Sequence, residues 1–256
     1  MLIAKDETLY IEEWLNFHLK QGVSHFIIFD NESAQDFHEV LKPYIDAGLV
    51  TYRTIRNKIR QFDAYNTAIH EYGHRFKYMG FIDADEFIFL RNNIDGGGGI
   101  SNLYEFVDEF MKAHPQAGGL GVNWCIFGSS GHITKPEGGV LENYTSRAEE
   151  DFIDNSELKT ICDPVKVWSF ASAHWPIYRR GFRNLNEDGE DISFCNCSPE
   201  IHFSKIRINH YFTKSREEFT IKKDVRGDVN NNFRGWSDFD EKDRNEVHDT
   251  EILSRV

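Results

Sequence analysis

Asp83, Asp85 and Glu86 place three acidic side chains within four residues, between the apolar runs 78–82 and 87–90. Burying an unpaired carboxylate is strongly unfavourable, so a partner of opposite charge is expected nearby. Asp-X-Asp presents two hard oxygen donors that can hold Mg²⁺ or Mn²⁺, and such an ion can in turn hold a diphosphate. The alternative for the tripeptide alone is a solvated turn with surface acids. The apolar runs on both sides favour a site.

The elements around this triplet predict an α/β sheet. Short apolar strands are expected at 1–4, 26–29, 49–52 and 78–82, and helices, with apolar side chains three and four residues apart, at 10–19, 40–45 and 62–72. Right-handed crossovers then give a mostly parallel sheet with helices on both faces. Ligands bind at the carboxyl ends of such strands, so Lys5, Asp6, Asp30 and the Asp83/Asp85 pair should converge on one edge. Alternatively, each is an ordinary polar loop residue.

The second half of the chain gives weaker signals. A helix is expected at 103–111, a strand at 119–127, a strand from Phe203 to His210, and a polar tail from Gly227 that wraps the surface or becomes ordered with ligand. Ser215 and Glu218 fit a capping box that opens a further helix. The glycine-rich loop 92–99 is assigned no chemistry, and residues 133–199 read as functional loops or ordinary long connections.

Composition restricts the class of protein. The net charge of −13 and pI near 5.3 argue against a nucleic-acid-binding surface, because phosphate backbones are held by clustered Lys and Arg. A length of 256 residues with 40% hydrophobic residues fits one folded domain, 1–256, without a marked boundary. The four cysteines lack the spacing of a disulfide framework or zinc site and are expected to be reduced: Cys125, Cys162, Cys195 and Cys197. Since no signal peptide or membrane-spanning run is recognised, a cytoplasmic enzyme is expected.

Several ordered motifs together resemble glycosyltransferases of the family 2-like and family 92-like groups. The resemblance runs to about Gly227 and rests on Lys5-Asp6-Glu7, Tyr10 to Trp14, Gly22-Val23, Asp30 to Ser33, Gln61 with Ala64-Tyr65-Asn66, Phe81 to Ile88, Asn123-Trp124, Phe127 to His132, Lys159 with Pro164, Ile208 to Ser215, and Glu217-Glu218-Phe219.

The resemblance implies a Rossmann-like nucleotide-sugar-binding fold of the glycosyltransferase A type, with a nucleotide-binding half (1–90), an acceptor and metal-completing half (91–226) and the tail (227–256). It further implies metal-dependent, inverting transfer from a nucleotide diphosphate sugar, expected to be a UDP-hexose. Carried over residue by residue, the nucleotide-sugar site would comprise Lys5, Asp6, Glu7, Asp30, Gln61, Asp83 and Ala84, and the metal ligands would be Asp83, Asp85 and His210. An imidazole ligand suits Mn²⁺ better than Mg²⁺.

The general base and the acceptor are predicted less directly. Glu142 is chosen as the base because it precedes Arg147 in a stretch loosely similar to the acidic-then-arginine element of family 2 enzymes, and Asp191 is the second choice. The acceptor, a glycan or glycoconjugate, is expected near Trp124, Ser129, Ser130 and His132; peripheral membrane contact is open. Two other classes fit the acidic triplet: a metal-dependent nucleotidyltransferase or phosphohydrolase, and a catalytically silent sugar-binding module.

Overall fold

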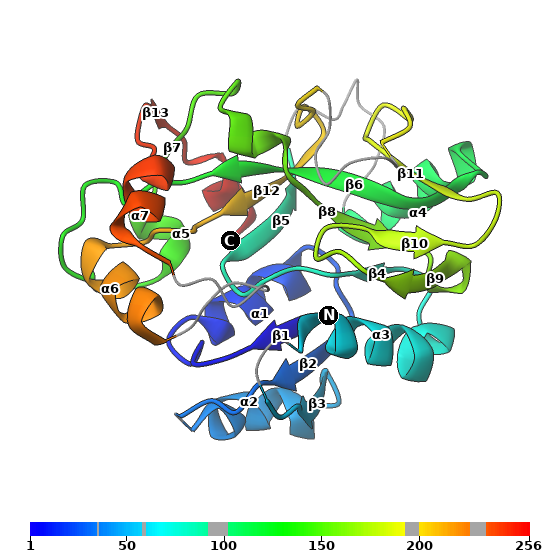
Figure 1. Cartoon of the computed structure of the whole chain (residues 1–256), viewed down its shortest axis with the longest axis horizontal. Coiled ribbons are helices and arrows are strands. Elements are labelled where there is room, and N and C mark those ends of the chain that lie inside the picture. The colour runs from blue at the N-terminus through cyan, green and yellow to red at the C-terminus, as the bar shows by residue number, and fades with distance from the viewer. Residues whose placement is uncertain (35, 58–59, 92–101, 193–199, 226–233) are drawn as a thin grey trace.

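The first half of the chain forms a three-stranded parallel sheet in the order β1-β2-β3 (Figure 1). The computed structural model describes residues 1–34, 36–57, 60–91, 102–192, 200–225 and 234–256. The elements of this half are β1 (Leu2–Ala4), α1 (Ile11–Lys20), β2 (Phe26–Asp30), α2 (Phe37–Asp46), β3 (Val50–Thr54) and α3 (Gln61–Tyr72). The predicted alternation of strands and helices is therefore confirmed here.

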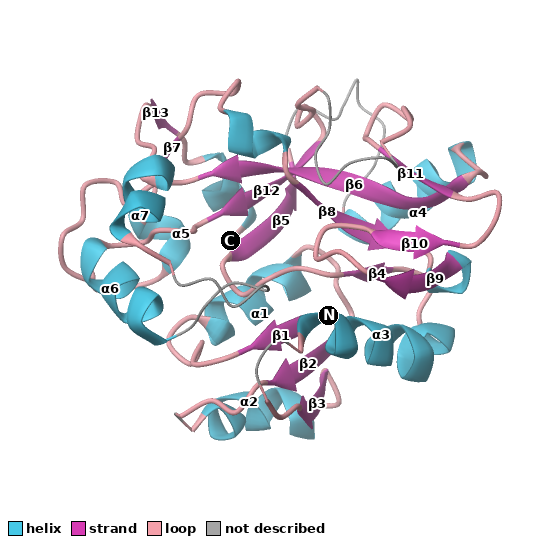
Figure 2. Cartoon of the chain, in the orientation of Figure 1, coloured by secondary structure: helices cyan, strands magenta, loops and turns pink. Residues whose placement is uncertain are grey.

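A second, six-stranded sheet carries the acidic triplet (Figure 2). Its path is β4-β8-β6-β12-β5, with β11 also paired to β6. These strands are β4 (Met79–Gly80), β5 (Glu86–Leu90), β6 (Ala117–Ile126), β8 (Leu158–Cys162), β11 (Arg183–Leu185) and β12 (Ile206–His210). The strand β8 is antiparallel to both neighbours, and β12 is antiparallel to β5 but parallel to β6.

The α/β class is confirmed, but the expectation of a mostly parallel sheet is wrong for this second sheet. Parallel neighbours need crossover connections of a dozen or more residues, usually helical. Between α4 (Leu103–Ala113) and β12, the described residues contain only one α-helix, the four-residue α5 (Val140–Asn143). The predicted strand 78–82 is also shorter than expected, because its pairing with β8 is limited to Met79 and Gly80.

Residues 133–192, the described part of the region 133–199, are more regular than the sequence indicated. They contribute β8 and β11 to the large sheet, and β9 (Val167–Phe170) pairs with β10 (Pro176–Tyr178). The remaining elements are β7 (Ser146–Arg147), α6 (Arg216–Val225), α7 (Trp236–Lys242), β13 (Val247–His248) and the 3₁₀ turns η1 (Gly73–Arg75), η2 (Ile153–Ser156), η3 (Pro164–Lys166) and η4 (Glu251–Arg255). The predicted loop 92–99 lies outside the described residues.

The C-terminal residues are part of the packed domain. Asp249 accepts hydrogen bonds from Nε of Arg147 (2.7 Å) and Nη2 of Arg207 (2.9 Å), and Ile252 is buried in the main apolar core. A buried guanidinium such as that of Arg207 needs an anionic partner, and Asp249 supplies it. Residues 234–256 are therefore ordered against the domain by these contacts, with Phe239 and Ile252 buried and the others at least partly exposed, while 226–233 lie outside the described part.

Two of the four cysteines can be placed. Cys125 and Cys162 are buried free thiols, as predicted, whereas Cys195 and Cys197 lie outside the described residues.

Within the described ranges, no helix has the length and apolar character needed to span a bilayer.

Candidate functional site

Asp83 is held by a buried lysine from β8. Its Oδ2 accepts a hydrogen bond from Nζ of Lys159 at 2.8 Å, and its Oδ1 accepts one from Nε2 of Gln61 at 3.3 Å. The Lys159 side chain is only 2% exposed and is also 3.7 Å from Oε1 of Glu86. Burial pushes the pKa of Asp83 upward, but the charge of Lys159 outweighs it and holds that pKa below its ordinary value. Asp83 is therefore an ionised, fixed carboxylate.

Asp85 lies between a lysine and a histidine from later parts of the chain. Its Oδ2 is 2.5 Å from Nζ of Lys222 on α6, and its Oδ1 is 3.6 Å from Nε2 of His210 at the end of β12. Burial opposes ionisation, but the charge of Lys222 outweighs it and holds the pKa of Asp85 well below its usual range. Pairing of β5 with β12 places Glu86 opposite His210, which brings Asp85 and His210 together.

His210 is held as a neutral imidazole. Burial lowers its pKa to about 3, although Asp85 opposes the shift. Its Nδ1 is buried and has no hydrogen-bond partner among the described residues. A neutral ring that faces a carboxylate without a hydrogen bond is chemically suited to ligate a metal.

Glu86 differs from the two aspartates. Burial raises its pKa to about 8, with Lys159 opposing, so the carboxyl is mainly protonated at pH 7. Its Oε2 accepts a hydrogen bond from the backbone N–H of Asp83 at 2.8 Å. Glu86 therefore shapes the turn, while Asp83 and Asp85 carry its negative charge.

The predicted nucleotide-binding residues lie at the ends of β1 and β2. Nζ of Lys5 donates to the carbonyl of Glu32 at 2.7 Å, and Oδ1 of Asp6 accepts from the backbone N–H of Ala34 at 2.6 Å. The Asp30 carboxylate accepts from the hydroxyls of Ser33 (2.6 Å) and Tyr52 (2.6 Å). These contacts tie the two loops together at one edge of the small sheet.

A cleft of about 110 Å³ lies between these loops and Lys222, the salt-bridge partner of Asp85. It is lined by Lys5, Asp6, Glu7, Leu9, Tyr10, Phe212, Thr213, Lys214, Glu218, Ile221 and Lys222. Because Lys222 also binds Asp85, the cleft and the Asp83/Asp85 carboxylates adjoin. The buried Ala84 spaces the two aspartates, and the Gln61–Asp83 contact links α3 to the same edge. Lys5 and Asp6 therefore share a cleft with Lys222, the partner of Asp85, and Asp30 is linked to Asp6 through Ser33. The two groups adjoin across two different sheets, whereas the sequence predicts one edge of a single sheet.

The helix at one wall of the cleft begins as predicted. Oε2 of Glu218 accepts from the backbone N–H of Ser215 at 3.1 Å, while the N–H of Glu218 donates to the Ser215 hydroxyl at 3.3 Å. The capping box is confirmed. Glu218 also accepts hydrogen bonds from the hydroxyls of Tyr10 and Tyr144, both at 2.5 Å, so it fixes α6 against the start of the domain.

The predicted metal ligands fit a divalent cation by donor type. Asp83 and Asp85 are ionised and His210 is neutral, which are the protonation states that ligation requires. Among the described residues, however, no group of three or more His, Cys, Asp or Glu side chains is already arranged around one metal position. The ammonium groups of Lys159 and Lys222 neutralise the two aspartates instead. Metal binding at this site stays a prediction.

The predicted acceptor residues divide into two groups. Trp124 lies beside His210, with ring centroids 4.3 Å apart. By contrast, the N–H of Ser129 donates to Asp243 (2.6 Å), the hydroxyl of Ser130 accepts from the N–H of Thr145 (2.9 Å), and His132 Nε2 lies 3.2 Å from the carbonyl of Asn143.

The small residues of that turn accommodate the protein's own chain. A Cβ added at Gly128 would lie 2.3 Å from the carbonyl oxygen of Arg244, so glycine is needed there for close approach of the C-terminal segment. The N–H of His132 donates to the carbonyl of Ser129 at 3.0 Å, so residues 128–132 form a tight turn closed against the C-terminal segment.

Among the described contacts, neither predicted base, Glu142 or Asp191, touches Asp83 or Asp85. Oε1 of Glu142 accepts from the backbone N–H of Gly139 at 2.9 Å and so caps its own short helix. Asp191 pairs with Arg183 of β11 at 3.1 Å, and strand β6 separates β11 from β8, which carries Lys159. Both assignments stay predictions, and the position of Asp191 does not favour it.

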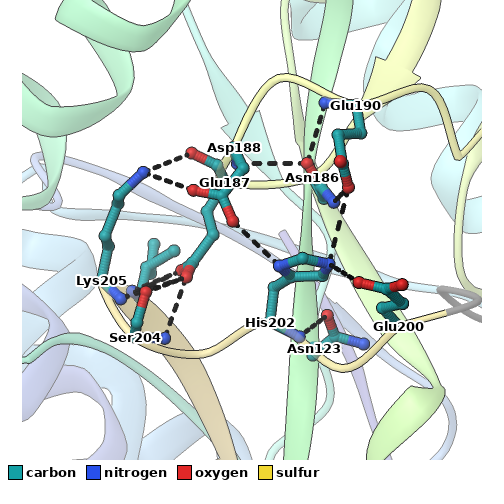
Figure 3. A network of polar contacts seen from close by, with 10 residues as sticks. Asn123, Asn186, Glu187, Asp188, Glu190, Glu200, His202, Ser204 and Lys205 are labelled. Atoms are coloured by element: carbon teal, nitrogen blue, oxygen red, sulfur yellow. Dashed lines mark hydrogen bonds and ion pairs between the residues drawn. The ribbon is translucent and has the colours of Figure 1, made fainter.

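Other acids of the second half form a separate polar network (Figure 3). Glu187 accepts from the backbone N–H groups of Ser204 (2.9 Å) and Ile206 (3.0 Å), and Asp188 pairs with Lys205 and His202. These residues precede β12, whereas His210 ends it. At about 3.3 Å per residue, the two ends of β12 are roughly 13 Å apart. The network is thus separate from the Asp83–Asp85 site.

Three residues near the site were not predicted from the sequence: Lys222, His174 and Glu157. Lys222 is one of several cations in a polar helix, and its salt bridge spans 137 residues of sequence. Glu157 precedes Lys159 by two residues, which would place both side chains on one face if the strand had been recognised. That spacing is the one signal that sequence reasoning could have used.

The comparisons with known proteins identify the family. The model of glycosyltransferase family 92 matches residues 2–248, and the chain belongs to that family. A glycosyltransferase family 92 protein of Ricinus communis is 28% identical over 190 residues, covering 73% of this chain and 32% of that protein. The galactan β-1,4-galactosyltransferase GALS2 of Arabidopsis thaliana is 37% identical over 112 residues, covering 40% of this chain and 21% of that enzyme. The chain therefore spans about a third or less of these relatives.

A solved structure is also similar. S. aureus TarS 1–349 in complex with UDP matches with a TM-score of 0.42 and 14% identity, covering 64% of this chain and 46% of that one.

Proposed function

We propose that this chain is a metal-dependent glycosyltransferase that moves a hexose from a UDP-hexose to a hydroxyl of a glycan or glycoconjugate, with inversion. The observation that carries the proposal is the approach of His210, from a distant segment, to Asp85 at 3.6 Å, two residues from Asp83 and beside a cleft lined by the β1 loop. Membership of family 92 supports the reaction class.

Asp85 and His210 would hold the divalent cation, and Asp83 would join them or contact the ribose. When bound, the cation supplies charge neutralisation for the departing diphosphate. Lys5 and Lys214 line the cleft and can add positive charge there, while Asp6 and Asp30 offer carboxylates to the ribose hydroxyls. Tyr10 forms part of an apolar wall that limits access of water.

Lys222 has a distinct place in this proposal. Its ammonium group contacts Asp85 (2.5 Å) and the carbonyl of Phe212 (2.9 Å). A cation bound by Asp85 would compete with this ammonium group for the same carboxylate. A released Lys222 would remain at the cleft and could bind a diphosphate oxygen.

Galactose is the first sugar to test. Relatives named galactan β-1,4-galactosyltransferases, GALS2 and GALS3, are 37% and 32% identical over their matched segments. Those segments cover 21% of each relative, so the donor and acceptor of this chain are proposals.

The test is binding followed by transfer. Thermal shift should be measured with UDP, GDP and CDP and with UDP-galactose, UDP-glucose and UDP-N-acetylglucosamine, each with and without Mn²⁺. We expect stabilisation by uridine nucleotides that depends on Mn²⁺ and is lost in Asp85→Ala, and transfer of galactose to a β-1,4-galactan oligosaccharide. Metal-dependent cleavage without a sugar acceptor would instead indicate a phosphohydrolase, and no response to any nucleotide would indicate a binding module.

A further inference from the structure

Glu157 extends strand β8 toward the reaction site. Its carbonyl accepts from the backbone N–H of Trp124 at 2.8 Å, which continues the pairing of β8 with β6 by one residue. Alternate residues of a strand share a face, so the side chain of Glu157 leaves the strand on the same side as that of Lys159. Lys159 binds Asp83, which places Glu157 next to the Asp83–Asp85 site rather than elsewhere on the sheet.

The carboxylate of Glu157 is accessible but incompletely satisfied. Its side chain is 33% exposed, yet Oε2 is buried and has no hydrogen-bond partner among the described residues. Oε2 lies 3.4 Å from Nδ1 of His174, and that nitrogen already lies 2.9 Å from the carbonyl of Leu158. A buried acceptor without a donor is costly, which points to a donor supplied by a ligand.

The charges around Glu157 suit a proton acceptor. Burial raises its pKa above the ordinary value and Asp154 adds to the shift, while Lys242 and Lys159 oppose it. A base with a raised pKa accepts a proton more readily near neutral pH. Burial lowers the pKa of His174 to about 4, so this neighbour is neutral and does not neutralise the carboxylate.

Aromatic rings join Glu157 to the proposed metal ligands. The ring of Trp124 contacts both His174 (5.5 Å between centroids) and His210 (4.3 Å). Its indole Nε1 is also buried without a hydrogen-bond partner among the described residues. A sugar hydroxyl that reaches Glu157 beside Trp124 would thus lie next to the ring that also contacts His210.

We propose that Glu157 is the general base of the transfer reaction and that Trp124 and His174 form the wall against which the acceptor sugar binds. The assignment rests on the proposed function. The proton of the acceptor hydroxyl passes to the Glu157 carboxylate as the acceptor oxygen bonds to the anomeric carbon. The bond from that carbon to the diphosphate breaks, and its electron pair leaves with the UDP.

The first test is Glu157→Gln, assayed with UDP-galactose, Mn²⁺ and a β-1,4-galactan oligosaccharide. We expect kcat to fall by roughly 10²- to 10⁴-fold, the usual contribution of a general base, with the affinity for UDP changed less than about twofold. The matched control is Asp151→Asn, an exposed acid of the same connection, which should keep wild-type kcat. A Glu157→Gln variant that retains more than a tenth of wild-type kcat would overturn the assignment.

A second test separates a base from a residue that only supports His174. In Glu157→Ala, sodium azide needs no base and should react from the acceptor side, giving a galactosyl azide of inverted configuration. Wild-type protein should form little of it. If Glu157→Ala binds UDP with Mn²⁺ but forms neither extended galactan nor galactosyl azide, Glu157 has a structural role and the assignment is wrong. Wild-type protein that neither binds UDP nor transfers sugar would overturn the proposed function itself.

Discussion

Two regions of this protein are rich in the same residue types, and only one has the features of a reaction site. The Asp83–Glu86 turn gathers Lys159, Lys222 and His210, whereas the network before β12 gathers Glu187, Asp188, Lys205 and His202 (Figure 3). In the network, Glu187 is saturated by backbone N–H groups, so its charge stabilises the chain. At the turn, Oε1 of Glu86, Nδ1 of His210 and Nε1 of Trp124 are buried without hydrogen-bond partners among the described residues.

The difference shows that hydrogen-bond saturation separates these regions better than residue composition does. A carboxylate whose acceptor sites are filled by the backbone has little left to offer a ligand. Buried polar atoms without partners are costly, and they persist where a ligand or a reaction supplies the partner. The His202 ring is the exception in the network: its Nδ1 pairs with Asp188 at 2.9 Å, but its Nε2, 3.6 Å from Glu190, is buried without a hydrogen-bond partner among the described residues.

The largest effect is expected from Asp85→Asn. The change keeps the size of the side chain but removes the charge that Lys222 and His210 face. We expect transfer to fall at least about 100-fold, because charge stabilisation of the leaving group is usually a large contribution to catalysis. Steady-state transfer of galactose with varied Mn²⁺ measures it. Unchanged transfer with the fold intact would remove the distinction between the two regions.

Glu187→Ala should affect stability rather than chemistry. The variant leaves the backbone N–H groups of Ser204 and Ile206 without their buried acceptor. We expect a loss of roughly 2–3 kcal/mol in the free energy of unfolding, measured by urea denaturation, with kcat of the folded protein unchanged. The control Glu190→Ala, at a side chain that is 64% exposed, should change the free energy by less than about 0.5 kcal/mol.

Lys222→Met tests whether this ammonium group competes with the cation. The variant lacks the 2.5 Å contact to Asp85, so we expect it to bind Mn²⁺ about tenfold more tightly than the wild type. When Mn²⁺ is absent, we expect the variant to bind UDP more weakly than the wild type. Electron paramagnetic resonance of free Mn²⁺ and calorimetry with UDP measure the two affinities. Lys223→Met, whose ammonium group lies 5.9 Å from the Trp236 ring centroid, is the matched control. Equal Mn²⁺ affinity in the wild type, Lys222→Met and Lys223→Met would exclude competition between Lys222 and the cation for Asp85.

The smallest effect concerns pH and His174. Burial lowers the pKa of this histidine from 6.5 to about 4, so between these values the unfolded chain binds more protons than the folded one. The free energy of unfolding therefore falls as pH drops below about 6.5. His174→Gln should remove about 1 kcal/mol of this loss between pH 7.5 and 5.5, a value reduced for the partial exposure of the ring. Parallel pH curves for wild type and variant would contradict a buried neutral histidine.

The sequence by itself determined the local elements of the first half and the residues that converge on its edge. Apolar spacing marked α1 and α3, and short apolar runs marked β1 and β2, because these periods follow from backbone geometry. The Ser215–Glu218 capping box was equally local. The family resemblance contributed Asp83, Asp85 and His210 as a group before any of their contacts were known.

Only the tertiary structure decided how the carboxylates are used. Glu142, Glu187 and Glu157 are the same residue type, yet Glu142 caps a helix and Glu187 binds backbone N–H groups. Glu157 keeps a buried oxygen that has no hydrogen-bond partner in the described ranges. The salt bridge of Lys222 with Asp85 joins residues 137 positions apart, which no local pattern encodes. Strand pairing decides which acids meet which cations. In this sheet, β8 and β12 pair antiparallel with β6 and β5, which brings Lys159 and His210 to the acidic turn.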